Sequence, residues 1–367
     1  MEFNVAHLIG RVARHIPDRE AVICGEQRST YRHFDDKSDR FARYLRSVGL
    51  GKGDHIAIYA YNSIEWIEAM LACYKVGAVP VNINYRYVEE ELAYIFTDAD
   101  IKAVVYDVEF APRLANIRGR LPLLQHLVHF EDPEHPPQDA ASVGFDTAGA
   151  GEYDVTMPEL SGDDHYVLYT GGTTGMPKGV VWRQQDVIMT LGGGVDVVSQ
   201  EAIGSPEAMA DRCTREDAFQ MRSLQMAPLM QGAAQWGVLR ALFEGHSVVL
   251  LSQRTFDPHE VWQLVEQEKV NVLLVTGDAM AKPMLDVLEQ GKYDTSSLFA
   301  FASTSAIFSP SLKDRYVDLL PNVVITDNIG SSESGYTGMT VHDKGKAESN
   351  AGGPRVSPSK DTVVLDD

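Results

Sequence analysis

The sequence predicts an α/β protein with two βα subdomains whose mostly parallel sheets pack together. Two observations predict this fold. Short apolar segments typical of buried strands alternate along the chain with segments in which apolar residues recur at helical spacing. A stretch rich in Pro, Gly, Ala and acidic residues, 131–157, separates two such series and is typical of a solvated linker. The chain of 367 residues is long enough for about two domains.

The first series begins with residues 55–61 (HIAIYAY), which predict a buried strand. Apolar residues then recur at helical spacing as far as Gly77, a residue type that commonly ends a helix. Residues 78–83 predict the next strand, so this part of the chain forms a βαβ unit. A helix over 88–98 and a strand over 103–106 continue the series.

The second series repeats this alternation between residues 247 and 326. Strands are expected at 247–251, 271–275, 299–303 and 322–326, and helices at 257–269, from there on to about 290, and at 311–320. Alternating strands and helices favour parallel sheets covered by helices. Residues 192–222 open with three glycines and have weak periodicity, which fits either a loop over a site or an irregular insertion.

The charge and the cysteines exclude several classes of protein. A net charge of −20 repels nucleic acid at long range, so we expect no nucleic-acid partner. A polyanion would need a local site built from backbone N–H groups or a metal. The three cysteines, Cys24, Cys73 and Cys213, form no CxxC pair, which favours reduced thiols in the cytoplasm. We see neither a signal peptide nor an apolar run of about 18 residues that could span a membrane.

Residues 169–179 (YTGGTTGMPKG) are dense in glycine and hydroxyl side chains and follow a segment that reads as a strand. Glycine lets the backbone approach a ligand closely, and successive N–H groups can form a concave anion site. The segment is not the common P-loop, because Lys178 is followed by Gly179 instead of Ser or Thr. A flexible surface turn is the alternative. The candidate phosphate-binding residues are Thr170, Gly171, Gly172, Thr173, Thr174 and Lys178.

The run TGGTTGMPKG, 170–179, resembles the signature of adenylate-forming (AMP-binding) enzymes, which include acyl-CoA synthetases, luciferases and the adenylation domains of peptide synthetases. Residues 30–58 and 62–87 resemble other segments of the same family in order and spacing. Within the family, INYRY at 83–87 and GMPKGVVW at 175–182 are similar to fatty-acyl and sterol-side-chain CoA ligases of actinobacterial type. The resemblance covers nearly the whole chain.

The resemblance implies a two-step reaction. ATP and a carboxylate give an acyl-adenylate and pyrophosphate, and the thiol of coenzyme A then displaces AMP. Because an anion attacks a highly charged phosphate, the site must neutralise charge and align the reactants. The resemblance gives Lys178 and Glu333 catalytic roles, with Thr170 and Glu333 as the Mg²⁺ ligands. A single carboxylate suits Mg²⁺, which takes its other ligands from water and phosphate.

Two further segments resemble those that hold the nucleotide in this family. The stretch 327–334 (DNIGSSES) corresponds to an aromatic-Gly-x-Thr-Glu motif, in which Ile329 replaces the aromatic residue and Ser332 the threonine. The segment 304–306 corresponds to Gly-Gly-Ala. The implied nucleotide-binding residues are Thr304, Ser305, Ala306, Asp327, Asn328, Ile329, Gly330 and Ser332.

An acyl pocket is expected around residues 228–237. The family's Pro-Leu-Phe-His reads Pro-Leu-Met-Gln here, and the small side chains that follow could leave space for an apolar chain. Close helix packing is the alternative for these small residues. For Gly277 the alternative is a turn that caps the next helix. The pocket residues implied are Met230, Gln231, Gly232, Trp236 and Gly277.

These features predict the N-terminal domain of an acyl-CoA synthetase that activates a carboxylic acid with an apolar chain or ring system. We expect residues 1–130 and 158–245 in a first subdomain, 246–335 in a second, and the start of a smaller β-rich subdomain over 336–367. No segment matches the family's C-terminal lid domain, so we expect a truncated chain that is poorly active alone. A non-catalytic homologue that binds acyl chains and nucleotide is the alternative. Peripheral membrane contact and a homodimer stay open.

Overall fold

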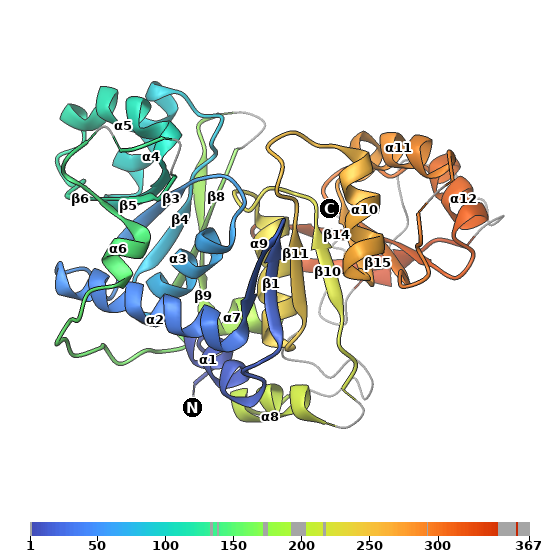
Figure 1. Cartoon of the computed structure of the whole chain (residues 1–367), viewed down its shortest axis with the longest axis horizontal. Helices are drawn as coiled ribbons and strands as arrows, with labels where there is room; N and C mark the ends of the chain where they lie inside the picture. The colour runs from blue at the N-terminus through green and yellow to red at the C-terminus, as the bar shows by residue number, and fades with distance from the viewer. Residues whose placement is uncertain are drawn as a thin grey trace, which may run out of the picture.

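The computed structural model describes residues 2–132, 135–137, 139–171, 175–191, 203–215, 218–291, 293–343 and 357–358. Its strands form a nine-stranded sheet, a five-stranded sheet and a two-stranded hairpin (Figure 1). This mixed arrangement of largely parallel sheets confirms the predicted α/β fold class.

The nine-stranded sheet is parallel in its centre and antiparallel at its edges. In spatial order its strands are β16 (Ser357–Pro358), β15 (Gly335–Val341), β14 (Val324–Ser331), β13 (Ala300–Ser303), β12 (Val272–Val275), β10 (Arg222–Gln225), β11 (Ser247–Leu250), β1 (Glu20–Cys24) and β2 (Gln27–Thr30).

The five-stranded sheet is parallel throughout. Its order is β4 (Val79–Asn82), β3 (His55–Tyr59), β5 (Ile101–Asp107), β6 (His126–Phe130) and β7 (Ser142–Gly144), and the separate hairpin consists of β8 (His165–Thr170) and β9 (Lys178–Arg183).

The helices cover both faces of the two sheets. They are α1 (Val5–His15), α2 (Tyr31–Ser47), α3 (Ile64–Lys75), α4 (Glu89–Asp98), α5 (Ala111–Ile117), α6 (Phe145–Gly149), α7 (Gln184–Thr190), α8 (Pro206–Asp211), α9 (Gly232–Phe243), α10 (Pro258–Glu268), α11 (Gly277–Leu288) and α12 (Pro310–Leu319). Each strand and helix expected in the two alternating series is present. The observed ends differ from the expected ends by a few residues at most, except that β14 runs on to Ser331. Among the described helices, none is both long and apolar enough to cross a membrane.

Three apolar cores hold the helices and the two sheets together in alternating layers. The largest core joins α1, α2, α3 and α9 to one face of each sheet, so these helices lie between the sheets (Figure 1). A second core packs α10, α11 and α12 on the outer face of the nine-stranded sheet, and a third packs α4 and α5 on the outer face of the five-stranded sheet. Helix α3 is buried on all sides, as a helix between two sheets must be.

The predicted linker over 131–157 is wrong in part, because β7 and α6 lie within it. Strand β7 pairs in parallel with β6, and Phe145 at the start of α6 is buried against Phe41 and Phe130, with ring centroids 4.4 and 5.3 Å away. The Glu131 carboxylate accepts hydrogen bonds from two backbone N–H groups at the start of this helix. One buried aromatic ring and one capping carboxylate therefore order a segment whose composition is typical of a loop.

The sheets do not follow the predicted division of the chain at residue 245. Strands β1, β2 and β10 come from the expected first subdomain, yet they lie in the nine-stranded sheet with the strands of the second. Likewise β15 and β16, expected in a separate β-rich part, extend this sheet at its edge. Strand pairing between residues far apart in sequence leaves no local signal. The alternation of strands and helices therefore could not predict which strands share a sheet.

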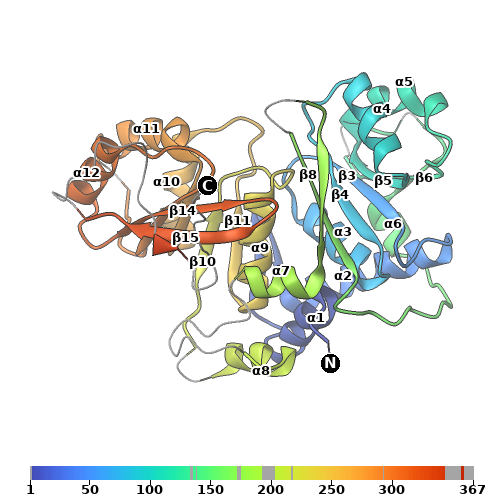
Figure 2. The ribbon, with the colours of Figure 1, turned by 180° about the vertical axis from the view of Figure 1, so that it is seen from behind.

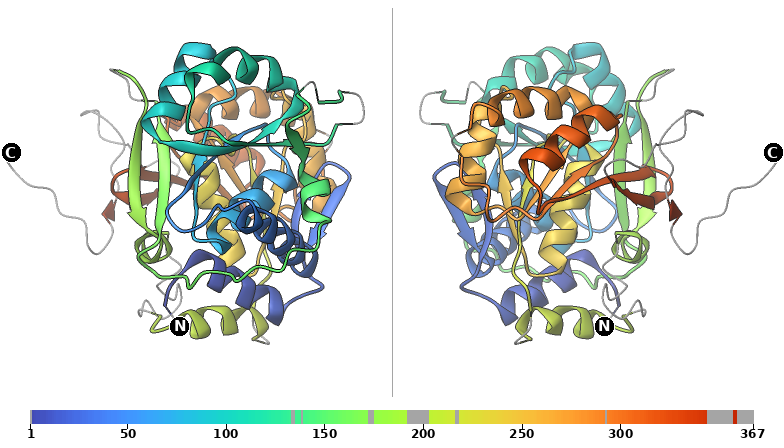
Figure 3. Two further views of the ribbon diagram at one scale, coloured as in Figure 1. Left: turned by 90° about the vertical axis from the view of Figure 1, so that its left-hand side faces the viewer. Right: turned by 90° about the vertical axis from the view of Figure 1, so that its right-hand side faces the viewer.

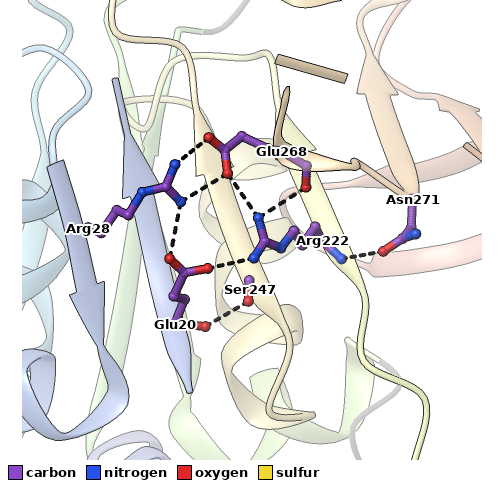
Figure 4. A network of polar contacts seen from close by, with 6 residues as sticks. All are labelled: Glu20, Arg28, Arg222, Ser247, Glu268 and Asn271. Carbon is purple, nitrogen blue, oxygen red and sulfur yellow. Dashed lines mark hydrogen bonds and ion pairs between the residues drawn. The ribbon is translucent and has the colours of Figure 1, made fainter. Parts of the chain in front are cut away.

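A network of two arginines and two glutamates fastens the amino ends of the nine-stranded sheet (Figure 4). The Glu268 carboxylate, from the last turn of α10, accepts from Arg28 at 2.5 and 3.0 Å and from Arg222 at 2.9 Å. Glu20 also binds both arginines. The network joins β1, β2, β10 and α10, and it lies at the opposite end of the strands from the pocket described below.

Residues 192–222, expected to be a loop or an insertion, are described only over 203–215 and 218–222. Helix α8 lies in this part and packs against α1, with Asp211 bonded to His15 at 2.9 Å. The remaining residues of this segment lie outside the described ranges.

Candidate functional site

The candidate phosphate loop is the tip of the β8–β9 hairpin. Thr170 at the end of β8 is paired with Lys178 at the start of β9, so these two expected ligand residues lie side by side where the two strands end. Thr170 is half-buried, whereas Gly171 and Lys178 are exposed. The other three residues expected here, Gly172, Thr173 and Thr174, lie outside the described residues.

Asn82, which the sequence did not single out, anchors this hairpin next to its tip. It ends β4 and is 5% exposed. Its side-chain oxygen accepts from the Tyr169 N–H at 2.8 Å, and its Nδ2 donates to the carbonyls of Tyr169 (2.9 Å) and Met230 (2.7 Å). One amide thereby ties the five-stranded sheet to the hairpin and to the segment before α9. A polar residue that ends a buried parallel strand is the only signal the sequence offers.

Tyr169 gives the hairpin a second attachment, since its hydroxyl donates to the Asp98 carboxylate at 2.7 Å. Burial and the adjacent negative charge raise the pKa of this phenol. The phenol therefore stays protonated and keeps donating at neutral pH.

Glu333 lies in the turn between β14 and β15 and is exposed. Around it, the Ser331 hydroxyl accepts from the Ser334 N–H, and Gly335 has a φ of +70°, a conformation that favours glycine. The turn packs against β9, because the Trp182 indole N–H donates to the Ser332 carbonyl at 2.8 Å. Figure 2 shows the β14–β15 hairpin pointing toward β9, and the hydrogen bond from Trp182 places the contact four residues beyond Lys178.

The rest of the 327–332 segment lies along β14. Asn328 is half-buried, while Ile329, at the position of the family's aromatic residue, is 39% exposed. Gly330 faces the Gly335 carbonyl so closely that a Cβ would clash with it. The Asp327 carboxylate forms an ion pair with Lys313 of α12, whose side chain is 1% exposed.

Residues 304–306 follow β13 and form a turn at the carboxyl edge of the nine-stranded sheet. Ser305 has a φ of +66°, so it keeps the backbone conformation typical of the glycine that the resemblance places here. Gly277 lies directly below this turn, since a Cβ on it would be 2.7 Å from the Ala306 Cβ. The absence of a side chain at Gly277 therefore allows close packing between the two strand ends.

A pocket opens between the carboxyl ends of the two parallel sheets. It encloses about 830 Å³ of empty space, including the part that is open to solvent. The lining residues are Tyr61, Asn62, Tyr85, Arg86, Met226, Pro228, Gln231, Leu251, Ser252, Gln253, Arg254, Phe256, Thr276 and Met280. Crevices at this edge of open parallel sheets are common ligand sites.

Of the five expected pocket residues, Gln231 lines this pocket, whereas Met230, Gly232, Trp236 and Gly277 do not. Gly232 instead abuts Leu168 of β8, and a Cβ there would clash with that side chain. Close packing of α9 on the hairpin, the alternative to an open space, thus accounts for this glycine.

The pocket rim carries contacts that bridge the two sheets. Arg254, which follows β11, forms an ion pair with Glu109 and lies over the Tyr61 ring, 4.6 Å from its centroid. The Tyr61 N–H donates to the Asp107 carboxylate at 2.6 Å. Burial raises the pKa of Asp107 to about 6.

The Thr170 hydroxyl lies at the tip of the β8–β9 hairpin, whereas the turn that carries Glu333 contacts β9 at Trp182, four residues beyond Lys178. Within the described residues, no cluster of three or more His, Cys, Asp and Glu side chains forms a ready-made metal cage. The exposed Glu333 carboxylate and the Thr170 hydroxyl could supply one oxygen each to Mg²⁺, which keeps most of its other ligands as water and phosphate oxygens.

Comparisons with known proteins agree in family and fold. Residues 9–367 match the family described as AMP-binding enzyme. The chain is 40% identical to a 3-oxocholest-4-en-26-oate--CoA ligase of Rhodococcus rhodochrous, over 100% of this chain and 66% of that protein. It is 42% identical to a medium/long-chain-fatty-acid--CoA/3-oxocholest-4-en-26-oate--CoA ligase of Mycobacterium tuberculosis, over 99% and 66%. The chain thus spans just under two thirds of the length of these relatives.

Solved structures show the same architecture. The inhibitor-bound N-terminal domain of FACL13 from Mycobacterium tuberculosis is 26% identical, with a TM-score of 0.73 over 92% of this chain and 78% of that one. The anthranilate CoA ligase AuaEII, solved with anthranoyl-AMP, is 22% identical, with a TM-score of 0.78 over 91% and 61%.

Proposed function

Since the chain belongs to the AMP-binding enzyme family, we propose that it forms the nucleotide-binding part of an acyl-CoA synthetase that activates a carboxylate with ATP and Mg²⁺ and passes it to coenzyme A. The contact between the two hairpins supports this function most directly. The Trp182–Ser332 hydrogen bond brings the turn carrying Glu333 against β9, the strand that also carries Lys178 at its other end.

In this proposal, the hairpin tip binds the β- and γ-phosphates through backbone N–H groups and the Lys178 ammonium. Glu333 and Thr170 hold Mg²⁺, which supplies the positive charge that the phosphates need. The chain carries a net charge of −20, so these local groups must offset repulsion between the protein and ATP. The hairpin's attachments through Asn82 and Asp98 keep the tip in place before the nucleotide arrives.

The proposed acyl substrate is a carboxylic acid with an apolar chain or ring system. Relatives with 40–42% identity are named as ligases for 3-oxocholest-4-en-26-oate and for medium- and long-chain fatty acids. The pocket between the sheets has apolar lining from Met226, Pro228, Leu251, Phe256 and Met280, which suits such a body. In this proposal Gln231, which lines the same pocket, hydrogen-bonds the polar end of the acid.

The cytoplasm is the proposed location. All three cysteines are free and buried, and burial raises their pKa values, so the thiols are unreactive. Free thiols fit the reducing compartment in which ATP and coenzyme A are available.

A non-catalytic homologue that binds acyl chains is the second candidate, and the exposed Ile329 favours it, because an aliphatic side chain stacks on a base less well than an aromatic ring. Calorimetry separates the two functions. Binding of apolar carboxylic acids without binding of ATP would favour the homologue.

The test of the proposed function measures pyrophosphate release by the protein carrying this chain, with ATP, Mg²⁺ and a panel of apolar carboxylic acids. Lys178→Ala and Glu333→Ala should each lower turnover by about 10²-fold or more, since each removes charge stabilisation in the transition state. Lys282→Ala is the matched control, because this lysine lies on the surface of α11 and pairs with Asp286 of the same helix. Unchanged turnover in both site variants would overturn the assignment.

A further inference from the structure

Arg254 lines the pocket between the two sheets and is held there by residues of the opposite sheet. It follows β11 of the nine-stranded sheet. Its guanidinium pairs with one oxygen of Glu109, which follows β5 of the five-stranded sheet, and lies over the Tyr61 ring. The Tyr61 hydroxyl donates to the other Glu109 oxygen at 3.1 Å. These contacts fix the orientation of the guanidinium at the edge of the pocket.

Most of the hydrogen-bond donors of Arg254 are left over. A guanidinium has five N–H groups and no acceptor. Within the part of the chain that the structure describes, the pair with Glu109 is the one hydrogen bond that this side chain makes. The side chain is 55% exposed. Its other N–H groups are therefore free to meet water or a ligand in the pocket.

Arg254 and Gln231 belong to different ends of the pocket. Gln231 follows Met230, whose carbonyl is held by Asn82 at the end of β4. Glu109 follows β5, and β3 lies between β4 and β5 in the sheet. Two strand spacings correspond to about 10 Å. If Gln231 meets the polar end of the acid, Arg254 faces the part of the molecule that is remote from the carboxylate.

We propose that Arg254 is a specificity-determining residue that donates a hydrogen bond to an oxygen at the end of the acid remote from its carboxylate. The site then prefers an apolar acid that carries such an oxygen, for example a ring ketone, to a plain hydrocarbon acid. This inference rests on the proposed function, because it takes the pocket as the acyl site and places the carboxylate end at Gln231.

The chemistry of the guanidinium explains the preference. A hydrocarbon end would cover the free N–H groups of Arg254 and remove their hydrogen bonds to water without replacing them, which costs free energy. A carbonyl oxygen restores one of these bonds. Because Glu109 already balances the charge of Arg254, a neutral oxygen fits better than a second carboxylate, which Glu109 would repel. The apolar lining from Met226, Leu251 and Met280 suits the hydrocarbon body.

The experiment compares two steroid acids. In 3-oxocholan-24-oate a ketone lies on the ring farthest from the carboxylate, and cholan-24-oate lacks this oxygen. Dissociation constants are measured by calorimetry on the 367-residue chain. The unmodified chain should bind the oxo acid about 5- to 20-fold more tightly, as expected for one hydrogen bond to a partly exposed charged group. Arg254→Met, which removes the donors and keeps an unbranched side chain, should reduce this ratio to below about 2-fold.

A matched variant and a third ligand serve as controls. Arg120→Met removes an arginine of similar exposure, 52%, that pairs with Glu90 and does not line the pocket, so the ratio should stay unchanged. Dodecanoate has a carboxylate and no second oxygen, so Arg254→Met should not weaken its binding. Because Arg254 is exposed, its substitution should leave the melting temperature within a few degrees of the original value.

Each outcome decides the proposal. A ratio in Arg254→Met equal to that of the unmodified chain would overturn it. An equal loss of affinity for all three acids would also overturn it, because Arg254 would then bind the carboxylate. If the unmodified chain binds dodecanoate but binds neither steroid acid, or binds both equally, the preference is wrong and the proposed function stands. If it binds none of the three acids, the acyl pocket of the proposed function fails as well.

Discussion

Two residues near the candidate site are unusual, one in its backbone conformation and the other in the pKa of its side chain. Ser305 holds a left-handed φ, and Asp107 is a buried carboxyl with a raised pKa. Each departure has a measurable consequence for stability.

Ser305→Gly should stabilise the chain. A non-glycine residue at a φ of +66° is strained by about 1 kcal/mol relative to glycine, which exceeds the entropy that glycine gains in the unfolded chain. The melting temperature should rise by a few degrees at most. Ser309→Gly is the control, because Ser309 has a φ of −67° and makes no capping hydrogen bond with its side chain. An equal rise in both variants would contradict the strain at Ser305.

Because of Asp107, the free energy of unfolding should decrease as the pH rises in mildly acidic solution. Its folded-state pKa of about 6 lies above the unfolded-state value of about 3.9, so the folded chain holds the proton more tightly. The stability that it contributes is complete below about pH 4 and is lost as the pH rises through about 6.

Asp107→Asn removes this titration. In urea unfolding across this pH range, the variant should gain stability relative to the unmodified chain by on the order of 2 kcal/mol as the pH rises. A difference between the two proteins that stays constant with pH would show that burial of this carboxyl has no such effect.

At the scale of secondary-structure elements, local signals predicted most helices and strands correctly. Helix α3 starts where the Ser63 hydroxyl caps the Trp66 N–H and ends just before Gly77, which has a φ of +70°. Both signals are readable in the sequence. The β7–α6 segment was missed because its order depends on Phe145 reaching rings of distant elements.

The attachment of the β8–β9 hairpin can be tested at Asn82. Asn82→Ala leaves buried backbone groups of Tyr169 and Met230 without their partner, and the expected loss of stability is about 2–4 kcal/mol. Because the tip of the hairpin then loses its fixed position, ATP affinity should fall by about 10-fold or more. Denaturant unfolding and calorimetry measure the two effects.

The control for this prediction is Asn116→Ala on α5, where the amide donates to the exposed Glu89 carboxylate at 3.0 Å. This variant should change neither quantity. If Asn82→Ala lowered stability but left ATP affinity intact, the hairpin would not need this anchor to bind phosphate.

At the scale of the whole molecule, contacts join segments that are remote in sequence at two places, one edge of the nine-stranded sheet and the amino ends of its strands. The β14–β15 hairpin reaches across to β9 at one side, as Figure 3 also shows, and the Arg–Glu network clamps the amino ends of the strands (Figure 4). Contacts of this kind hold the layers together and set the shape of the pocket between the carboxyl ends.

Glu268→Ala should destabilise the chain by about 2–4 kcal/mol, because Glu268 is 7% exposed and its loss leaves two arginines beside each other without the shared carboxylate. The partial exposure of the arginines keeps the loss toward the lower end of this range. Asp286→Ala, which breaks an exposed helical pair, should cost less than about 0.5 kcal/mol. Equal losses in both variants, measured by urea unfolding, would contradict a structural role for the network.

The sequence by itself determined the α/β class, the alternation of strands and helices, and the segments 170–178 and 327–334 that carry the proposed phosphate and metal ligands. These features depend on local spacing and on residue chemistry, which a sequence displays directly. It also indicated Gln231, Pro228, Thr276 and Met280 as pocket residues, but not most of the other lining residues, and not Asn82 or Lys313. Only the tertiary structure decided which strands share a sheet, which small residues serve packing, and which polar side chains hold the two hairpins and Asp327. Those outcomes depend on contacts between residues far apart in the chain, whose favourable energy arises only after the intervening chain has been ordered.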